Sequence, residues 1–487
     1  MSLSALKDSS LLKTQAYIDG QWVDGENGAT FDVTDPATGD VIAKVADLGA
    51  AQTRQAIAAA DVAMQAWKQK TAKERSNILR KWFELMMQNQ EDLAQIMTAE
   101  QGKVIAESRG EVGYGASFIE WFAEEGKRIY GDVIPQTTAD RRSIVIKQPI
   151  GVVAAVTPWN FPNAMITRKA APALVAGCAI VLKPAAETPL SALAMAELAD
   201  RAGIPAGLFN VVTGINAPEI GAELTSNPTV RKFTFTGSTP VGKLLMAQCA
   251  GTVKRTSMEL GGNAPVIVFD DADIDKAVAG AIGTKFRNAG QTCICANRLI
   301  VQDTIYDAFV EKLTAKVNEF KVGNGFDAGT TIGPLITEQA VAKVGSLVAD
   351  AADKGATVNT GGAQHEAGSH FYQPTVLSNL SADMRIAKEE IFGPVAPVFK
   401  FSTEEEAIAM ANDTEFGLAA YVFTESMSRT WRVSEAIEYG MVGVNEVAIS
   451  SEVIPFGGVK ESGQGREGSK YGLDDYLETK YICLGGI

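Results

Sequence analysis

Cys293 is the residue of this chain whose surroundings best fit nucleophilic chemistry. It lies in the run Asn288-Ala-Gly-Gln-Thr-Cys-Ile-Cys-Ala-Asn297. A thiol becomes a nucleophile when a base, a cation or a helix N-terminus stabilises its thiolate. The only histidines, His365 and His370, share a glycine-rich stretch that is typical of a surface loop. A Cys–His pair is therefore not expected, and the general base must be a carboxylate or a lysine.

A carboxylate and a rigidly held amide lie upstream of the nucleophile. Glu259, in Met258-Glu-Leu-Gly-Gly, is the predicted base. Asn160 lies in Thr157-Pro-Trp-Asn-Phe-Pro162, where two prolines restrict the backbone around it. An oxyanion hole needs a donor that is in place before charge develops. A plain turn is the alternative, since Asn and Pro are common turn residues.

Two segments are candidates for binding a phosphate or a ribose. Phe235-Thr-Gly-Ser-Thr-Pro-Val-Gly242 ends a predicted strand and opens a helix, whose N-terminus favours an anion. The spacing of Gly237 and Gly242 is not that of G-x-G-x-x-G, so an ordinary strand–helix turn is an equal alternative. Lys183 follows an apolar strand and could reach a ribose or phosphate; a solvated strand end is the alternative.

The composition excludes several classes of partner. With 44 Lys plus Arg against 58 Asp plus Glu, the chain has a net charge of −14. Such a surface repels nucleic acid and anionic membranes, so we expect neither as a partner. Five cysteines among 487 residues do not make a disulfide framework. The first twenty residues lack the apolar block of a secretory signal, so a cytoplasmic location is expected.

Strand–helix alternation predicts an α/β fold of two or three domains. Helical periodicity runs from about residue 57 to 129, and β-rich runs at 151–157, 179–183, 209–212 and 232–236 follow. Alternation of this kind predicts a parallel sheet that binds ligands beyond the carboxyl ends of its strands. A second series follows Pro265, with predicted helices near 277–286, 306–320 and 340–354 and strands to about 444.

Two further segments are typical of subunit contacts. Residues 131–148 have the pattern of a hairpin whose polar middle projects outward. The tail at 476–484 alternates as an edge strand does, and an exposed edge needs a partner. We therefore expect a homodimer or a homotetramer.

Six motifs together resemble the aldehyde dehydrogenase superfamily in order and spacing, over essentially the whole chain. They are Thr157-Pro-Trp-Asn-Phe-Pro, Phe235-Thr-Gly-Ser, Met258-Glu-Leu-Gly-Gly, Gly290-Gln-Thr-Cys, Glu389-Glu-Ile-Phe-Gly-Pro and Pro455-Phe-Gly-Gly-Val-Lys. Segments 118–131 and 465–472 are most similar to bacterial succinate-semialdehyde dehydrogenases. The resemblance implies a Rossmann-type NAD(P)-binding domain (1–129 and 150–261) and an α/β catalytic domain (262–461). A small β oligomerisation element would comprise 130–149 and 462–487.

The resemblance also implies a mechanism. Cys293 would attack the aldehyde, and Asn160 with a backbone amide would bind the oxyanion. Hydride would leave for a nicotinamide ring, and Glu259 would activate the water that hydrolyses the thioester. Lys169 would orient Glu259 or that water. The implied cofactor site consists of Trp159, Lys183, Ala186, Gly237, Ser238, Glu390 and Phe392.

Ala186 bears on the choice of coenzyme. Family members that prefer NAD usually have a glutamate three residues after the equivalent of Lys183, and here the acid comes one residue later, at Glu187. Without a carboxylate nothing repels a 2′-phosphate, while Lys183 attracts it. The sequence therefore predicts that NADP is preferred and that NAD is also used, unless Glu187 reaches back to the ribose.

Three residues predict a substrate that carries a carboxylate. Arg168 and Arg287 stand where relatives acting on apolar aldehydes commonly have aromatic residues, and Ser450 matches a serine of the same pocket. Surface or salt-bridging arginines are the alternative. We expect Arg287→Leu to cost ~2–5 kcal/mol, as for unpairing a buried charge.

The predicted reaction is the oxidation of succinic semialdehyde to succinate. Glutarate semialdehyde or another ω-oxo acid remains an alternative, as do a coenzyme A-acylating enzyme and a non-catalytic relative of the fold.

Cys295 has two interpretations. It lies two residues after the nucleophile and could form a reversible disulfide with it, which is the interpretation we favour; a packing role is the alternative. No metal site is predicted, because the two cysteines lack a second pair of ligands.

Overall fold

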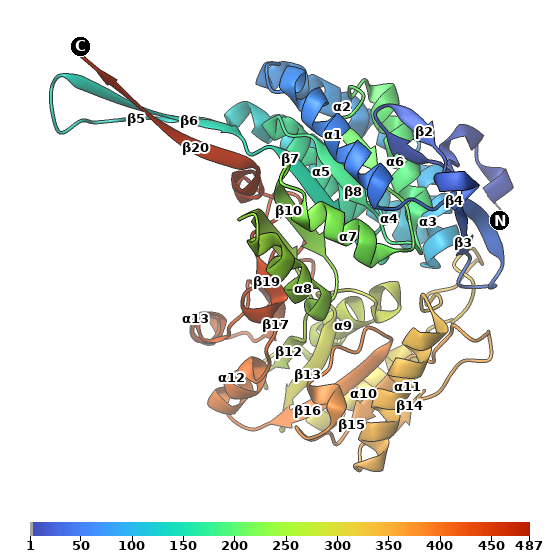
Figure 1. The fold of residues 1–487 in the computed structure, drawn as a ribbon. Coiled ribbons are helices and arrows are strands. Elements are labelled where there is room, and N and C mark those ends of the chain that lie inside the picture. Colours follow the sequence, from blue (N-terminus) through green and yellow to red (C-terminus); the bar gives the residue numbers. More distant parts are fainter. Residues whose placement is uncertain (1–2) are drawn as a thin grey trace.

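The computed structural model describes residues 3–487 as two α/β halves and a projecting arm (Figure 1). The first half, mostly blue to green in Figure 1, is built on an eight-stranded sheet. The second half, mostly yellow to red, is built on a seven-stranded sheet, and three strands form the arm. The predicted α/β class is confirmed.

The eight-stranded sheet has a parallel centre and antiparallel edges. Its order is β19-β11-β10-β7-β8-β9-β1-β2, in which β11 to β9 are parallel. Central strands β7 and β8 are almost wholly buried, because helices cover both faces of the sheet. The bounds are β1 Ala16–Ile18, β2 Gln21–Val23, β7 Val152–Val156, β8 Ile180–Lys183, β9 Phe209–Val211, β10 Val230–Thr236, β11 Arg255–Glu259 and β19 Gly463–Gln464.

The helices of the first half follow the predicted periodicity. Ile57, Ala60, Met64 and Trp67 are all buried on one face of α1. Thr71 and Glu74 form a capping box at the start of α2. The helices are α1 Ala50–Trp67, α2 Ala72–Gln88, α3 Gln90–Gln101, α4 Ile105–Glu125, α5 Ala164–Ala176, α6 Pro189–Ala202, α7 Ala217–Ser226 and α8 Thr239–Ala250; a ribbon of β3 Thr30–Thr34 and β4 Val41–Ala46 lies beside them.

The seven-stranded sheet has the order β14-β15-β16-β13-β12-β17-β18 and is parallel except for β14. Its strands are β12 Ala264–Val268, β13 Ala296–Gln302, β14 Thr357–Thr360, β15 Thr375–Ser378, β16 Val395–Phe401, β17 Ala419–Phe423 and β18 Met441–Val444. Its helices are α9 Ile274–Lys285, α10 Tyr306–Val317, α11 Glu338–Asp353, α12 Glu404–Asn412 and α13 Met427–Ala436. Nowhere in residues 3–487 is a helix both long and apolar enough to cross a membrane.

The arm is a three-stranded sheet that extends from the body and carries the C-terminus (Figure 1). It consists of β5 Asp132–Ile134, β6 Arg141–Pro149 and β20 Leu477–Gly485, and β20 pairs with β6 along its full length. The predicted tail boundary needs a correction. Strand β19 covers the open edge of β11, so residues 463–464 belong to the first half and not to the arm.

Candidate active site

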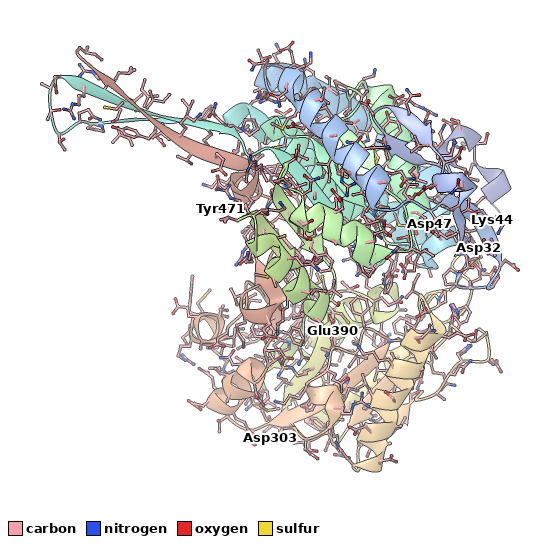
Figure 2. The ribbon with its side chains drawn as sticks, in the orientation of Figure 1. Asp32, Lys44, Asp47, Asp303, Glu390 and Tyr471 are labelled. Atoms are coloured by element: carbon pink, nitrogen blue, oxygen red, sulfur yellow. The ribbon has the colours of Figure 1, made fainter. Side chains whose placement is uncertain are left out.

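A cavity of about 290 Å³ lies where the two halves meet, beyond the carboxyl ends of β10 and β11. Figure 2 shows Glu390, one of its residues, in the middle of the molecule between the halves. The cavity brings together eight of the predicted site residues. These are Trp159, Asn160, Gly237, Ser238, Glu259, Cys293, Glu390 and Phe392.

The segment that leads to Cys293 is a left-handed turn. Residues 288–290 have φ angles of +50°, +54° and +78°, a region that side chains disfavour. Gly290 is required there, because a Cβ would lie 2.2 Å from the carbonyl oxygen of Gly393. At Gly262 a Cβ would lie 2.4 Å from the carbonyl oxygen of Cys293. The glycines of three motifs thus let their backbones close around the nucleophile.

The Cys293 thiol is neutral in this environment. Burial raises its pKa to about 12, and the positive charge of Arg168 offsets only part of that effect. At neutral pH the thiol therefore keeps its proton, and its reaction requires a base.

Glu259 is a buried carboxyl without a partner. It ends β11 and is 4% exposed, and neither of its oxygens has a hydrogen-bond partner among the described residues. Burial, and secondly the negative charge of Glu467, raise its pKa well above the usual range. A carboxyl in such a setting exchanges a proton far closer to neutral pH than an exposed one does, as general-base chemistry needs.

Asn160 is fixed at both its backbone and its side chain. Its carbonyl oxygen accepts hydrogen bonds from Lys103 Nζ at 2.6 Å and from Asn288 Nδ2 at 3.1 Å. Its own Nδ2 donates to the carbonyl oxygen of Gln291 at 3.0 Å. An amide nitrogen carries two N–H groups, so one remains for a ligand in the cavity.

Glu467 was not predicted as a site residue, yet it pairs with both cations of α5. Its Oε2 lies 2.7 Å from Arg168 Nε, and its Oε1 accepts a hydrogen bond from Lys169 Nζ. Burial alone would raise its pKa, but Lys169 and Arg168 lower it below the usual range. The motif Gly465-Arg-Glu-Gly, already noted for its resemblance, was the available signal.

These pairs show which groups the two α5 cations contact. Lys169 Nζ donates to Glu467 and, at 2.6 Å, to Thr236 Oγ1, so it does not hydrogen-bond Glu259. Arg168 is 1% exposed, pairs with Glu467 and lies over the ring of Phe456 at 3.9 Å, and its contact with a substrate carboxylate stays a prediction. One guanidinium nitrogen, Nη2, is buried without a hydrogen-bond partner among residues 3–487.

Four residues predicted for the cofactor site, Trp159, Ser238, Glu390 and Phe392, line this cavity. The rings of Trp159 and Phe392 pack edge to face, with their centres 5.7 Å apart. Ser238 precedes α8 without capping it, which leaves N–H groups of its first turn for an anion. Glu390 accepts a hydrogen bond from Gly262 N at 3.1 Å, and burial raises its pKa to about 7. These residues fit a dinucleotide with a phosphate at α8 and an apolar ring beside Trp159.

Lys183 and Ala186 are not among the residues that line this cavity. Lys183 is 4% exposed, and its Nζ donates to the carbonyl oxygen of Pro184 at 3.2 Å. Ala186 lines a different cavity of about 400 Å³, together with the exposed Glu187.

Arg287 and Ser450 line a third cavity, of about 330 Å³, that includes Phe161. Met165, which lines the first cavity, packs in one cluster with Phe161 and Tyr114 of this one, so the two cavities adjoin. The hydroxyls of Tyr114 and Ser450 form a hydrogen bond there, and the Arg287 guanidinium lies 5.0 Å from the ring of Phe161. Arg287 is exposed, so the cost predicted for unpairing a buried charge is too large.

Cys295 is buried, and its Sγ lies 3.5 Å from the carbonyl oxygen of Lys285, to which it donates. Burial raises its pKa, which disfavours the reactive thiolate. Within residues 3–487 no three His, Cys, Asp or Glu side chains are grouped so that they could ligate a metal ion.

Residues 22–482 match the sequence profile described as "Aldehyde dehydrogenase family". The chain belongs to the aldehyde dehydrogenase family. Known aldehyde dehydrogenases resemble it over nearly their full length. The NADP-dependent succinate-semialdehyde dehydrogenase of Escherichia coli is 63% identical, with 99% of each chain covered.

Other curated relatives act on different aldehydes. A glutarate-semialdehyde dehydrogenase of Pseudomonas aeruginosa is 62% identical, covering 99% of this chain and 100% of its own. A 3-sulfolactaldehyde dehydrogenase of Pseudomonas putida is 62% identical, with 99% of each covered. Among solved structures, an Escherichia coli protein described as an NADP-dependent enzyme superposes with a TM-score of 0.98, at 63% identity and with 99% of this chain and 100% of that chain covered. The predicted fold and family are confirmed.

Proposed function

We propose that this aldehyde dehydrogenase oxidises succinic semialdehyde to succinate and prefers NADP to NAD. One observation carries the proposal: Cys293, Glu259 and Asn160 line a cavity that adjoins a second one lined by Arg287 and Ser450. The first cavity supplies a nucleophile, a base and an oxyanion donor. The second supplies a cation and hydroxyls for a carboxylate.

In the first half-reaction the Cys293 sulfur adds to the aldehyde carbon. A C–S bond forms, the carbonyl π bond breaks, and the thiol proton passes to Glu259, whose raised pKa suits that acceptance. The free N–H of Asn160, with a backbone amide, donates to the new oxyanion. A bound nicotinamide coenzyme supplies the hydride acceptor.

In the second half-reaction water cleaves the thioester on Cys293. After it has released the thiol proton to solvent, Glu259 accepts a proton from the attacking water. The C–S bond breaks, the Cys293 sulfur takes up a proton again, and the carboxylate product leaves. Glu259 can accept the water proton only when ionised, and its lack of hydrogen bonds leaves both oxygens free for water. The fixed charges of Lys169 and Glu467 lie beside it and do not occupy those oxygens.

The preference for NADP rests on Ala186, where a carboxylate would repel a 2′-phosphate. We expect Ala186→Glu to lower kcat/KM with NADP by about tenfold or more and to spare NAD. Ala186→Gln, similar in size but uncharged, is the control. An Ala186→Glu enzyme whose coenzyme ratio equals that of Ala186→Gln would remove residue 186 from the ribose site.

Glutarate semialdehyde is the alternative substrate, because one methylene is worth only ~1–3 kcal/mol of discrimination. The sulfonate named for one relative has the same charge, so charge alone does not select among the three. Transfer of the acyl group to coenzyme A is disfavoured, because Glu259 is a base suited to water.

The deciding experiment follows the absorbance of the reduced coenzyme with succinic semialdehyde, glutaric semialdehyde and pentanal. We expect kcat/KM to be highest for succinic semialdehyde and lowest for pentanal. Because Arg287 is exposed, Arg287→Leu should cost only ~1 kcal/mol for the semialdehydes and nothing for pentanal. Equal values for pentanal and succinic semialdehyde in the wild type would reject the substrate class.

We further propose that the arm joins subunits into a homodimer or a homotetramer. Val133 and Tyr481 on the arm are 77% and 60% exposed. Exposed apolar side chains of this kind are typical of a surface that contacts another subunit. Tyr481→Glu together with Val133→Asp should give a smaller species in light scattering. An unchanged mass would reject the arm as the interface. The cytoplasmic location stays a prediction.

A further inference from the structure

A buried ion pair contacts the backbone of Asn160. Lys103 Nζ lies 2.6 Å from Glu111 Oε2, and both side chains are 1% exposed. The same Lys103 Nζ donates to the Asn160 carbonyl oxygen at 2.6 Å and stands 4.1 Å from the centre of the Phe161 ring. The lysine thus reaches from the α3–α4 joint to the loop that carries the oxyanion donor.

Glu111, the acid of this pair, accepts hydrogen bonds from the other end of the same loop. Glu111 Oε1 accepts hydrogen bonds from the backbone N–H groups of Asn163 and Ala164, at 2.9 and 3.2 Å. Residues 160 to 164 are therefore held at their first carbonyl by Lys103 and at their last amides by Glu111.

A second acid on α4 holds the nucleophile segment. Both oxygens of Glu107 accept the backbone N–H of Asn288, at 3.0 and 3.1 Å, at the start of the left-handed turn. Glu107 and Glu111 are four residues apart and so share one face of the helix. One helical face thereby sets the Asn160 loop and the Cys293 loop relative to each other.

Stability alone does not account for a buried ion pair at this place. Apolar residues of similar size are often as stabilising as a buried pair, because the desolvation of two charges offsets their attraction. A charged donor to a carbonyl oxygen, however, gives a short and well-directed hydrogen bond. The pair therefore contributes geometry, and that geometry is applied to Asn160.

We propose that Lys103 is a positioning residue for oxyanion stabilisation: it fixes the Asn160 carbonyl, and with Glu111 it aims the Asn160 amide at the reacting carbon. This proposal rests on the proposed function, in which Asn160 is the oxyanion donor. Lys103 and Glu111 also line the cavity that holds Arg287 and Ser450, but in this role Lys103 acts through the Asn160 carbonyl oxygen and not on the reacting atoms.

A double-mutant cycle between Lys103→Met and Asn160→Ala tests the proposal. In the wild-type background we expect Lys103→Met to lower kcat about tenfold to a hundredfold, less than the loss of a whole oxyanion donor. Coenzyme affinity, measured by fluorescence titration, should not change. In the Asn160→Ala background the same substitution should lower kcat no further. Lys127→Met, which breaks the exposed pair with Glu124 at the C-terminal end of α4, is the matched control and should leave kcat unchanged.

Equal losses of kcat in both backgrounds would overturn the proposal, as would no loss in the wild-type background. If Lys103→Met leaves Glu111 unpaired and fails to fold, Lys103→Met/Glu111→Gln removes both charges and enters the same cycle with the same expectation. A failure of the proposed function is a separate result, since the wild-type enzyme would then not oxidise the aldehyde at all.

Discussion

Two buried carboxylates, at the end of β11 and in the loop after β19, have opposite properties. Glu259 and Glu467 are each 4% exposed, so burial is the same for both. Glu467 pairs with Arg168 and Lys169, and its pKa is lowered despite burial. Glu259 has no hydrogen-bond partner in the part of the chain that the structure describes, and its pKa is raised. The cationic partners, and not the degree of burial, therefore decide which of the two carboxyls is held ionised.

The presence or absence of a charged partner separates the side chains that react from the side chains that position them. Cys293 and Glu259 line the cavity, and their raised pKa values keep protons exchangeable where the chemistry needs them. Lys103, Lys169 and Glu467 surround them with every charge paired. Each of these charges is held in place by its partner, so the three side chains serve as fixed geometry.

The largest loss of activity is expected when the nucleophile is removed. Cys293→Ala should lower kcat by about 10⁴-fold or more, because the other groups then have no covalent intermediate to act on. Coenzyme affinity should stay within error, since the paired surroundings remain. Steady-state turnover with titrated active sites measures the loss. Residual activity above a few per cent would place the nucleophile elsewhere.

Removing the base should separate the two half-reactions. Glu259→Gln should lower kcat by about 10²–10⁴-fold, the usual contribution of a general base. Because water attack needs the base, an acyl adduct on Cys293 should accumulate. Intact-mass spectrometry of the quenched variant detects it. Slow turnover without any adduct would mean that Glu259 serves only the first half-reaction.

Neutralising the paired carboxylate should change the unpaired one. Wild-type activity requires ionised Glu259, so its raised pKa places the acidic limb of kcat/KM above the range of an ordinary glutamate. Glu467→Gln removes a negative neighbour and frees two cations, which lowers the pKa of Glu259 and moves that limb to lower pH. An unmoved limb would show that the two carboxyls are independent.

The same substitution should destabilise the fold. Breaking a buried ion cluster costs ~3–5 kcal/mol, which thermal unfolding near neutral pH would register. The sign of the pH dependence follows from the lowered pKa of Glu467. Its stabilisation is present above the pKa of the unfolded state and is lost as the pH falls through the folded value. The stability gap between wild type and variant should therefore narrow in acid.

The sequence predicted the reacting groups better than the groups that hold them. Glu259 ends β11 and Asn160 lies just after β7, and the carboxyl ends of parallel strands meet at one edge. Cys293 lies before the start of β13 and was predicted from its motif. Glu467 pairs with a lysine 298 residues away, and no local period or spacing reports such a contact. The same limit explains Arg168 and Arg287, which differ in burial although their residue type predicted one role.

The smallest change in activity is expected from a substitution of Cys295, which differs from Cys293 in its surroundings. One thiol lines the cavity, and the other is packed against the Lys285 carbonyl. Cys295→Ala should leave kcat within about twofold, because a buried small side chain that does not line the cavity is replaced by a similar one. After peroxide treatment the wild type should recover with dithiothreitol through a Cys293–Cys295 disulfide. The variant lacks the second thiol, so its nucleophile should pass to the sulfinic acid and stay inactive. Equal recovery in both would assign Cys295 to packing alone.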